Sequence, residues 1–245
     1  MRVGVLGATG RMGQATCRAV LAAGDLELVA VVARSTAVGR ELRTVIPEAP
    51  PDLLIGQDLS DVISAEVDVV VDFSAPDATM AAARTLLPEA IHLVSGTTGL
   101  PDGAMEELAS LTSDDEGGNA VWAPNFALGA VLAMQFAEQA AALFPHVEIV
   151  ELHSEHKLDA PSGTAQTTAE RIRAVTGHDV PIHSVRLPGL VAHQETLLGG
   201  EGQLLTIRHD ATSREAFTPG VLLAVRRVRE LPPGLTVGLE TFLTP

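Results

Sequence analysis

The sequence predicts an α/β protein in which a doubly wound parallel sheet is followed by a smaller α+β domain with a mixed sheet. Three observations support this prediction. Strand and helix patterns alternate through the first half of the chain. Glycines spaced three apart, at positions 7, 10 and 13, follow the first apolar run. Three consecutive strand patterns without helices between them occupy residues 182–208, so the second half has a different architecture.

Short apolar runs and Ala-rich stretches define the elements of the first half. Strands are expected at residues 2–6, 26–32, 67–73, 92–94 and 120–123, and helices at 14–23, after 74–77 and at 102–111. A further short strand and helix are expected between residues 53 and 64. Ser74 or Asp77 is expected to cap the helix that ends near Leu87.

The second half is expected to begin with a long apolar helix over residues 127–144. A strand at 147–152, a helix at 162–175 and strands at 182–187, 190–198 and 203–208 follow, and a helix at 214–230 and a strand at 236–242 close the chain. The predicted domains are residues 1–127 and 128–216, with residues 217–245 as a C-terminal segment that returns to the first domain.

The composition excludes several classes of protein. An apolar share of 46% with a mean hydropathy of +0.25 supports a packed core, and a net charge of −15 disfavours nucleic acid and anionic membranes as partners. We find no signal-peptide pattern and no apolar run long enough to span a bilayer, so a cytoplasmic location is expected. The single cysteine, Cys17, excludes an internal disulfide and is expected in the core.

The glycine-rich turn from Gly7 to Gly13 lies between a predicted strand and a predicted helix. Such a turn lets the backbone approach a pyrophosphate, although the spacing is GxxGxxG and a purely structural turn is the alternative. The next strand ends in Ala33-Arg34-Ser35, where NAD-preferring sites usually carry an acidic residue. Arg34 can pair with a 2′-phosphate, so NADPH is the predicted preference; a solvated Arg34 with use of both NADH and NADPH is the alternative.

A polar stretch from Glu151 to Ala165 lies on a predicted strand-to-helix loop, the kind of segment that often carries chemistry. It contains the only lysine of the chain, Lys157, whereas the other 15 basic residues are arginines. An ammonium can give up a proton, and a guanidinium cannot. Its neighbours are His153, His156, Asp159 and the Ser162-Gly163-Thr164 helix start. The stretch therefore predicts a site for an anionic substrate, with chance placement of one lysine as the alternative.

Four segments together resemble the dihydrodipicolinate reductase family. They are Glu151–Ala165, Gly7–Gly13, Ser95-Gly-Thr-Thr-Gly99 and Ala123-Pro-Asn-Phe126. The resemblance covers nearly the whole chain, and the Lys-x-Asp-Ala-Pro-Ser-Gly-Thr string is its most specific part. It implies a Rossmann-type first domain, for the dinucleotide, and a second domain for substrate binding and oligomerisation. The family forms homotetramers through that second domain.

The activity that the resemblance implies is NADH- or NADPH-dependent reduction of 4-hydroxy-tetrahydrodipicolinate, by way of dihydrodipicolinate, in diaminopimelate and lysine biosynthesis. The cofactor residues would be Gly7, Ala8, Thr9, Gly10, Arg11 and Met12 at the pyrophosphate and Gly96, Thr97, Thr98, Ala123, Pro124, Asn125 and Phe126 on the nicotinamide side. His153 matches a proton donor and acceptor, Lys157 a proton donor, and Gly163 and Thr164 a carboxylate-binding pair. No metal ligands are predicted.

The chain departs from the family pattern at two places. Ser154 stands where the family commonly has a second histidine that helps to bind the substrate, and the segment before Ile182 is short. Ser154 keeps a hydrogen-bonding group but loses the positive charge. A paralogous reductase of another cyclic imine carboxylate and a non-catalytic NADP-binding sensor are the alternatives. His156 is expected to orient the loop only.

Overall fold

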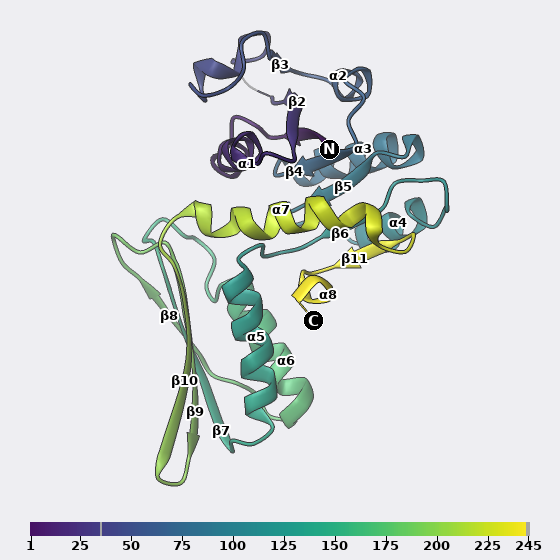
Figure 1. Ribbon diagram of the computed structural model, residues 1–245. Coiled ribbons are helices and arrows are strands. Elements are labelled where there is room, and N and C mark those ends of the chain that lie inside the picture. The colour runs from purple at the N-terminus through teal and green to yellow at the C-terminus, as the bar shows by residue number, and fades with distance from the viewer. Residues whose placement is uncertain (35, 244–245) are drawn as a thin grey trace. The chain divides into compact units, whose positions relative to one another are not determined.

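The computed structural model describes residues 1–34 and 36–243, and the chain divides into two compact units (Figure 1). Unit 1 comprises residues 1–126 and the segment that begins at Phe217, and unit 2 comprises residues 127–216. Each unit has its own sheet. The predicted fold class, a doubly wound parallel sheet with a smaller mixed-sheet domain, is confirmed.

Unit 1 is built on a parallel sheet. In the described residues this sheet has seven strands in the order β11-β6-β5-β4-β1-β2-β3. The strands are β1 (Arg2–Leu6), β2 (Glu27–Val32), β3 (Ile55–Gly56), β4 (Val69–Asp72), β5 (His92–Ser95), β6 (Ala120–Trp122) and β11 (Leu235–Val237). The chain reverses its direction of travel across the sheet between β1 and β4. In sheets of this kind, ligands bind beyond the carboxyl ends of the strands at such a reversal.

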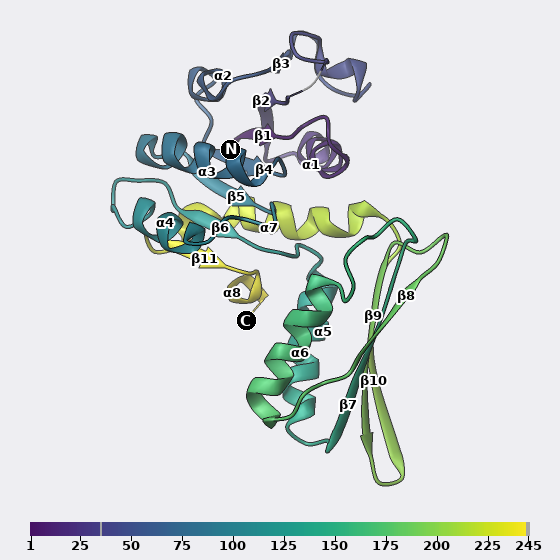
Figure 2. The same ribbon diagram turned by 180° about the vertical axis from the view of Figure 1, so that it is seen from behind.

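Helices cover both faces of this sheet, which explains why its central strands are mostly apolar. They are α1 (Arg11–Ala22), α2 (Leu59–Ser64), α3 (Pro76–Leu86), α4 (Ala104–Leu111), α7 (Thr218–Arg227) and α8 (Glu240–Leu243), with short 3₁₀ turns at Leu42–Thr44, Leu87–Glu89, Arg214–Phe217 and Val228–Glu230. Helices α1 and α7 pack together on one face, and α2, α3 and α4 lie on the other (Figures 1 and 2). Met80, Leu86, Leu93 and Leu108 are fully buried between α3, α4 and the sheet.

The predicted cap of helix α3 is wrong. The N-cap is Ala75, followed by Pro76 in the first turn, and Asp77 lies inside that turn. The hydroxyl of Ser74 instead donates a hydrogen bond to Asp72. A capping side chain would accept a backbone N–H of the helix through its oxygen, but the N-cap of α3 is an alanine, and the Ser74 hydroxyl is positioned by the hydrogen bond that it donates to the buried carboxylate of Asp72.

The C-terminal elements also differ from the prediction. The helix expected over residues 214–230 is α7 flanked by two 3₁₀ turns, since Pro219 has no N–H for a preceding helical turn. The strand expected over residues 236–242 stops at Val237, because Gly238 adopts a φ of +81°, and α8 follows. Strand β11 pairs with β6 in the sheet of unit 1.

Cys17 is fully buried in α1, as predicted. Burial raises the pKa of its thiol to about 12, so the thiol stays protonated and acts as a small core side chain.

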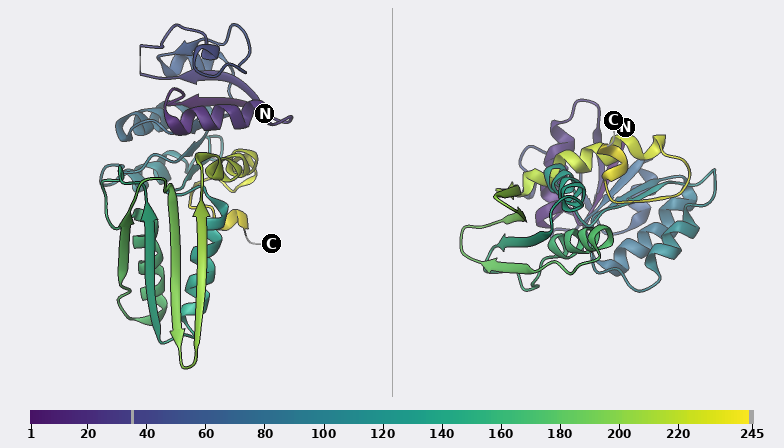
Figure 3. Two further views of the ribbon diagram at one scale, coloured as in Figure 1. Left: turned by 90° about the vertical axis from the view of Figure 1, so that its left-hand side faces the viewer. Right: turned by 90° about the horizontal axis from the view of Figure 1, so that it is seen from below.

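Unit 2 contains a mixed sheet covered by helices on one face. Its elements are α5 (Leu128–Ala141), β7 (His146–His153), α6 (Gly163–Thr176), β8 (Ile182–Arg186), β9 (Ala192–Gly200) and β10 (Gln203–Ala211). The strand order is β10-β9-β7-β8, with β8 parallel to β7 and the other pairs antiparallel. Ile149, Ile172 and Leu198 are buried between the sheet and α5 and α6. In the described part of unit 2, no helix covers the other face of the sheet (Figure 3).

Over residues 1–34 and 36–243, no helix combines the length and the apolar character that a membrane span requires.

Candidate active site

The glycine turn of unit 1 follows β1 and is tied to the end of β2. The backbone N–H groups of Gly7 and Ala8 donate to the Val32 carbonyl, at 2.9 and 3.2 Å. Gly7 has a φ of +75°, and a Cβ built on it would lie 2.5 Å from the carbonyl oxygen of Phe73. This position therefore requires glycine, and the turn packs closely against the segment after β4.

A cavity of about 310 Å³ lies beside this turn. Four residues predicted to bind the cofactor line it, namely Gly7, Thr9, Gly10 and Arg34, together with Gln57, Phe73 and Ser74. Gly10 is the N-cap of α1, so the cavity lies at the N-terminus of this helix, where backbone N–H groups can bind a phosphate. These residues fit a dinucleotide. Arg11 and Met12 lie in the first turn of α1, and Ala8 is buried.

The residues predicted for the nicotinamide side follow two neighbouring parallel strands. Gly96, Thr97 and Thr98 come after β5, and Ala123 to Phe126 come after β6. A Cβ on Gly96 would lie 2.2 Å from the ring of Phe73 and 3.0 Å from that of Phe126, so glycine is needed there too. The indole N–H of Trp122 donates to the Thr97 carbonyl at 2.9 Å. The structure thus brings these two segments together.

A fully buried carboxylate, Asp72, holds the start of this region, and it has no role in the sequence prediction. It accepts hydrogen bonds from the hydroxyls of Ser74, Thr79, Ser95 and Thr97, and from the backbone N–H of Ser74 at 3.0 Å. Ser74 and Thr79 come after β4, Ser95 is the last residue of β5, and Thr97 follows β5. Asp72 therefore fixes the predicted nicotinamide segment to the neighbouring loop.

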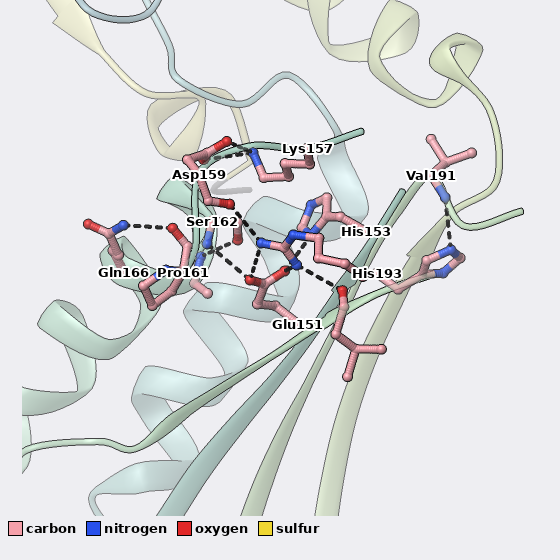
Figure 4. A network of polar contacts seen from close by, with 12 residues as sticks. Glu151, His153, Lys157, Asp159, Pro161, Ser162, Gln166, Val191 and His193 are labelled. Carbon is pink, nitrogen blue, oxygen red and sulfur yellow. Dashed lines mark hydrogen bonds and ion pairs between the residues drawn. The ribbon is translucent and has the colours of Figure 1, made fainter. Parts of the chain in front are cut away.

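In unit 2, Lys157 lies in the loop between β7 and α6 (Figure 4). Its ammonium donates to both carboxylate oxygens of Asp159, at 2.8 Å each. The Lys157 side chain is 27% exposed and that of Asp159 is 61% exposed. The hydrogen bond from Lys157 lowers the pKa of Asp159, so this carboxyl is ionised at neutral pH.

His153 ends β7 and is oriented by a buried glutamate. Its Nδ1 contacts the carboxylate of Glu151, which has no exposed surface. Burial raises the pKa of Glu151, but hydrogen bonds from Arg186, Ser184 and His153 outweigh burial and bring it to about 2. Burial lowers the pKa of His153. The ionised carboxylate therefore assigns the proton of a neutral imidazole to Nδ1 and leaves Nε2 as an acceptor.

The predicted carboxylate-binding pair opens helix α6. Ser162 is the N-cap, and its hydroxyl accepts the N–H of Ala165 at 3.2 Å. Gly163 and Thr164 are the first two helical residues, so their N–H groups lie at the positive end of the helix dipole. A Cβ built on Gly163 meets no atom within 4 Å, so the space before this helix end is open.

Ser154 and His156, the remaining predicted residues of the loop, form hydrogen bonds inside the loop. The Ser154 carbonyl accepts the N–H of Lys157 at 3.0 Å, and its hydroxyl accepts the N–H of His156 at 3.4 Å. The imidazole of His156 is 87% exposed, and its Nε2 lies 3.8 Å from the carboxylate of Glu155. The backbone of His156, rather than its ring, takes part in the turn.

Three residues that organise the two sites have no role that the sequence patterns predict: Asp72, Glu151 and Arg186. A signal was present in each case, because each is a charged residue within or at the end of an apolar strand pattern. Such a residue needs a buried partner, but the pattern does not name the partner. Arg186 bonds Glu151 from the neighbouring strand β8.

The fold and the glycine turn place the chain among Rossmann-type α/β proteins that carry a second domain with a mixed sheet. Two family models match it, described as the N-terminus of dihydrodipicolinate reductase over residues 1–126 and the C-terminus of the same enzyme over residues 129–243. The chain belongs to the dihydrodipicolinate reductase family, and the resemblance found in the sequence is confirmed.

Individual relatives match over almost the full chain. The 4-hydroxy-tetrahydrodipicolinate reductase of Moorella thermoacetica is 45% identical over 99% of this chain and 98% of its own length, and that of Nocardia farcinica is 44% identical over the same shares. The solved structure of a dipicolinate-bound dihydrodipicolinate reductase from Paenisporosarcina sp. TG-14 is 38% identical, with a TM-score of 0.86 over 99% of both chains. An amine dehydrogenase from Mycobacterium smegmatis, 12% identical with a TM-score of 0.71, shares the fold.

Proposed function

We propose that this protein is an NAD(P)H-dependent reductase that converts 4-hydroxy-tetrahydrodipicolinate, by way of dihydrodipicolinate, to tetrahydrodipicolinate in diaminopimelate and lysine biosynthesis. The names of its full-length relatives and the dipicolinate bound to a solved relative support this substrate class. The observation that carries the proposal is the single loop that presents the only lysine, an oriented histidine and an open helix N-terminus.

The residues of unit 2 suit a dianionic cyclic imine. Gly163 and Thr164 bind one carboxylate at the start of α6, and the Ser154 hydroxyl adds a donor to the substrate. The bound cofactor supplies hydride. Negative charge then develops on the reduced ring, and the Lys157 ammonium neutralises it and donates a proton. His153 accepts or returns a proton at Nε2, because Glu151 holds Nδ1.

The residues of unit 1 bind the cofactor, with Gly7 to Met12 at the pyrophosphate and the segments Gly96–Thr98 and Ala123–Phe126 at the nicotinamide. NADPH is preferred over NADH, because Arg34 lines the cavity beside the glycine turn and can pair with a 2′-phosphate.

A paralogous activity on another cyclic imine carboxylate is the second candidate, and Ser154 is the observation that favours it. A hydroxyl that already accepts the N–H of His156 replaces a cationic side chain of the family pattern. One charge that would bind a substrate carboxylate is therefore missing. The missing charge should weaken the binding of a dicarboxylate more than the binding of a substrate with one carboxylate.

The assembly is a homotetramer formed through the sheet of unit 2, in the cytoplasm. The face of this sheet opposite α5 and α6 carries apolar side chains. They are Val150, Leu152, Val185, Leu197 and Leu204, and Leu204 is 68% exposed. Pairing with a second copy would cover this face. Sedimentation analysis of the wild type and of Leu204→Glu tests it, and a monomeric wild type contradicts it.

Oxidation of NADPH with freshly made 4-hydroxy-tetrahydrodipicolinate tests the activity. The panel includes a cyclic imine with a single carboxylate as a control substrate. The proposal expects kcat/KM to be higher for the dicarboxylate by roughly tenfold or more, because a charged hydrogen-bonded group is lost in the control. A preference for the monocarboxylate favours the paralogous activity, and cofactor binding without turnover of any substrate favours a sensor.

A further inference from the structure

A buried ion pair lies directly beneath the loop that carries Lys157. Glu151 of β7 has no exposed surface, and Arg186 ends the neighbouring parallel strand β8. Two guanidinium nitrogens donate to the two carboxylate oxygens, each at 2.8 Å. This bidentate geometry fixes both side chains in one orientation, which a lysine in place of Arg186 could not do.

Both members of the pair also bond the loop itself. Besides His153, Glu151 accepts the backbone N–H of Ser162 at 3.2 Å. Arg186 donates to the carbonyl of Asp159 at 2.7 Å. Figure 4 shows Glu151 and His153 of β7 beside Asp159 and Ser162 of the loop. The pair thus holds the imidazole, the residue that binds the Lys157 ammonium, and the residue before Gly163.

We propose that Glu151 and Arg186 are positioning residues of this reductase, with Glu151 keeping the His153 proton on Nδ1 and Arg186 holding the loop that presents Lys157. This inference rests on the proposed function, since it gives His153 and Lys157 their roles. Glu151 and Arg186 would influence the substrate only through His153 and Lys157. Nε2 becomes the single nitrogen of His153 that exchanges protons.

The charges around His153 make the inference testable, because they act in opposite directions. Burial lowers the pKa of His153 most; among the charges, Glu151 favours the imidazolium, whereas Lys157 and Arg186 disfavour it. Asp159 faces Lys157 and accepts its ammonium. Loss of the Glu151 charge should therefore lower the pKa of His153, and loss of the Arg186 charge should raise it. A pair without electrostatic influence on His153 would not shift the pKa of its imidazole in opposite directions in the two variants.

The experiment titrates His153 directly in protein labelled with ¹⁵N at histidine, using His153→Gln to assign its signals. The wild type is expected to show the Nδ1–H tautomer. Glu151→Gln is expected to titrate at lower pH than the wild type and Arg186→Met at higher pH, and the matching limb of the kcat profile should move with them. Both variants should lose kcat by roughly tenfold or more, with NADPH affinity retained.

The matched control is Glu138→Gln, which removes the carboxylate of another ion pair in unit 2. Glu138 bonds Arg171 between α5 and α6 at 2.8 Å, and its loss should leave the titration of His153 unchanged. If a single variant fails to fold, Glu151→Met/Arg186→Met replaces it, because apolar residues of similar volume often substitute well for a buried ion pair. His153 should then lose its preference for the Nδ1–H tautomer.

Three results would overturn the inference: an Nε2–H tautomer in the wild type, equal shifts in the same direction in both single variants, or an unchanged tautomer in the double variant. The titration needs no substrate. A wild type that lacks turnover but gives the expected titration therefore rejects the proposed function and leaves the positioning of His153 standing. If the wild type turns over the substrate, but the tautomer and the titration of His153 are the same in the variants as in the wild type, only the inference is rejected.

Discussion

The two units each bury a carboxylate at or near the carboxyl end of a strand, and they satisfy it in different ways. Asp72 of unit 1 is surrounded by hydroxyl and N–H donors, and all of its donors among the described residues are neutral. Glu151 of unit 2 bonds a guanidinium, an imidazole and a backbone N–H. Neutral donors only fix the shape of a loop. Charged or titratable partners also couple the buried carboxylate to proton transfer.

This difference matches the tasks that we propose for the units. A nucleotide-binding loop needs a fixed backbone, and the neutral donors gathered around Asp72 supply it. A site that handles protons needs groups whose charge states depend on each other. The comparison therefore predicts that charge changes in unit 2 alter chemistry, while changes at Asp72 alter stability and cofactor binding.

The largest expected effect is at Lys157. Lys157→Ala should lower kcat by roughly 10²- to 10⁴-fold, the usual range for a lost proton donor, while NADPH affinity stays nearly unchanged. His153→Ala is likewise expected to lower kcat strongly and to leave NADPH affinity nearly unchanged. Steady-state kinetics with a separate measurement of NADPH binding checks both.

Lys157→Arg sharpens this test, because it keeps a positive charge but holds its proton permanently. It should preserve substrate binding better than the alanine variant and still turn over slowly. Near-normal turnover in Lys157→Ala and His153→Ala would remove the assigned roles.

The next effect is on the stability of unit 1. Asp72→Ala leaves several buried donors without their acceptor and should lower the free energy of unfolding by about 3 kcal/mol or more. Urea unfolding followed by the fluorescence of Trp122 measures this, since Trp122 is the only tryptophan, the chain has no tyrosine, and its indole bonds the Thr97 carbonyl. The KM for NADPH should rise as well.

Asp77→Ala is the matched control for Asp72→Ala. Asp77 is a carboxylate in the first turn of α3, only five positions away and outside the buried network, and its loss should change stability by at most about 0.5 kcal/mol. Equal effects of the two substitutions would contradict the role given to the buried carboxylate.

The pH dependence of stability should report Glu151. Its pKa in the folded protein is about 2, below the ordinary value of 4.5, so the folded state favours the ionised form. The resulting stabilisation, about 3 kcal/mol, is fully present above pH 4.5 and is lost as the pH falls toward 2. Urea unfolding followed by circular dichroism across this range measures it.

The double variant Glu151→Met/Arg186→Met should lack this component. Its unfolding free energy should fall less steeply than that of the wild type between pH 4.5 and 2. Parallel curves for the two proteins would show that the ion pair contributes no pH-dependent stability.

The sequence predicts the two sheets well, because apolar runs and glycine turns act locally. The polar networks are less predictable, since their partners lie far apart in the chain. Glu151 and Arg186 are separated by 35 positions and meet only because β7 and β8 pair in parallel register. Similarly, the local pattern predicts Ser74 as a cap of α3, but Asp72 takes its hydroxyl in a network that extends to Thr97. Local patterns indicate that a buried charge needs a partner, but only the strand register identifies it.

The smallest expected effect is at Arg34 of unit 1. Arg34 is the only charged residue among the described residues that line the cavity beside the glycine turn. If it pairs with a 2′-phosphate, Arg34→Ala should lower kcat/KM for NADPH by roughly tenfold and leave that for NADH nearly unchanged. Arg40→Ala, an exposed arginine of the same unit, is the control and should leave the ratio of the two values unaltered. An unchanged ratio in Arg34→Ala would mean that Arg34 is a solvated charge and takes no part in distinguishing NADPH from NADH.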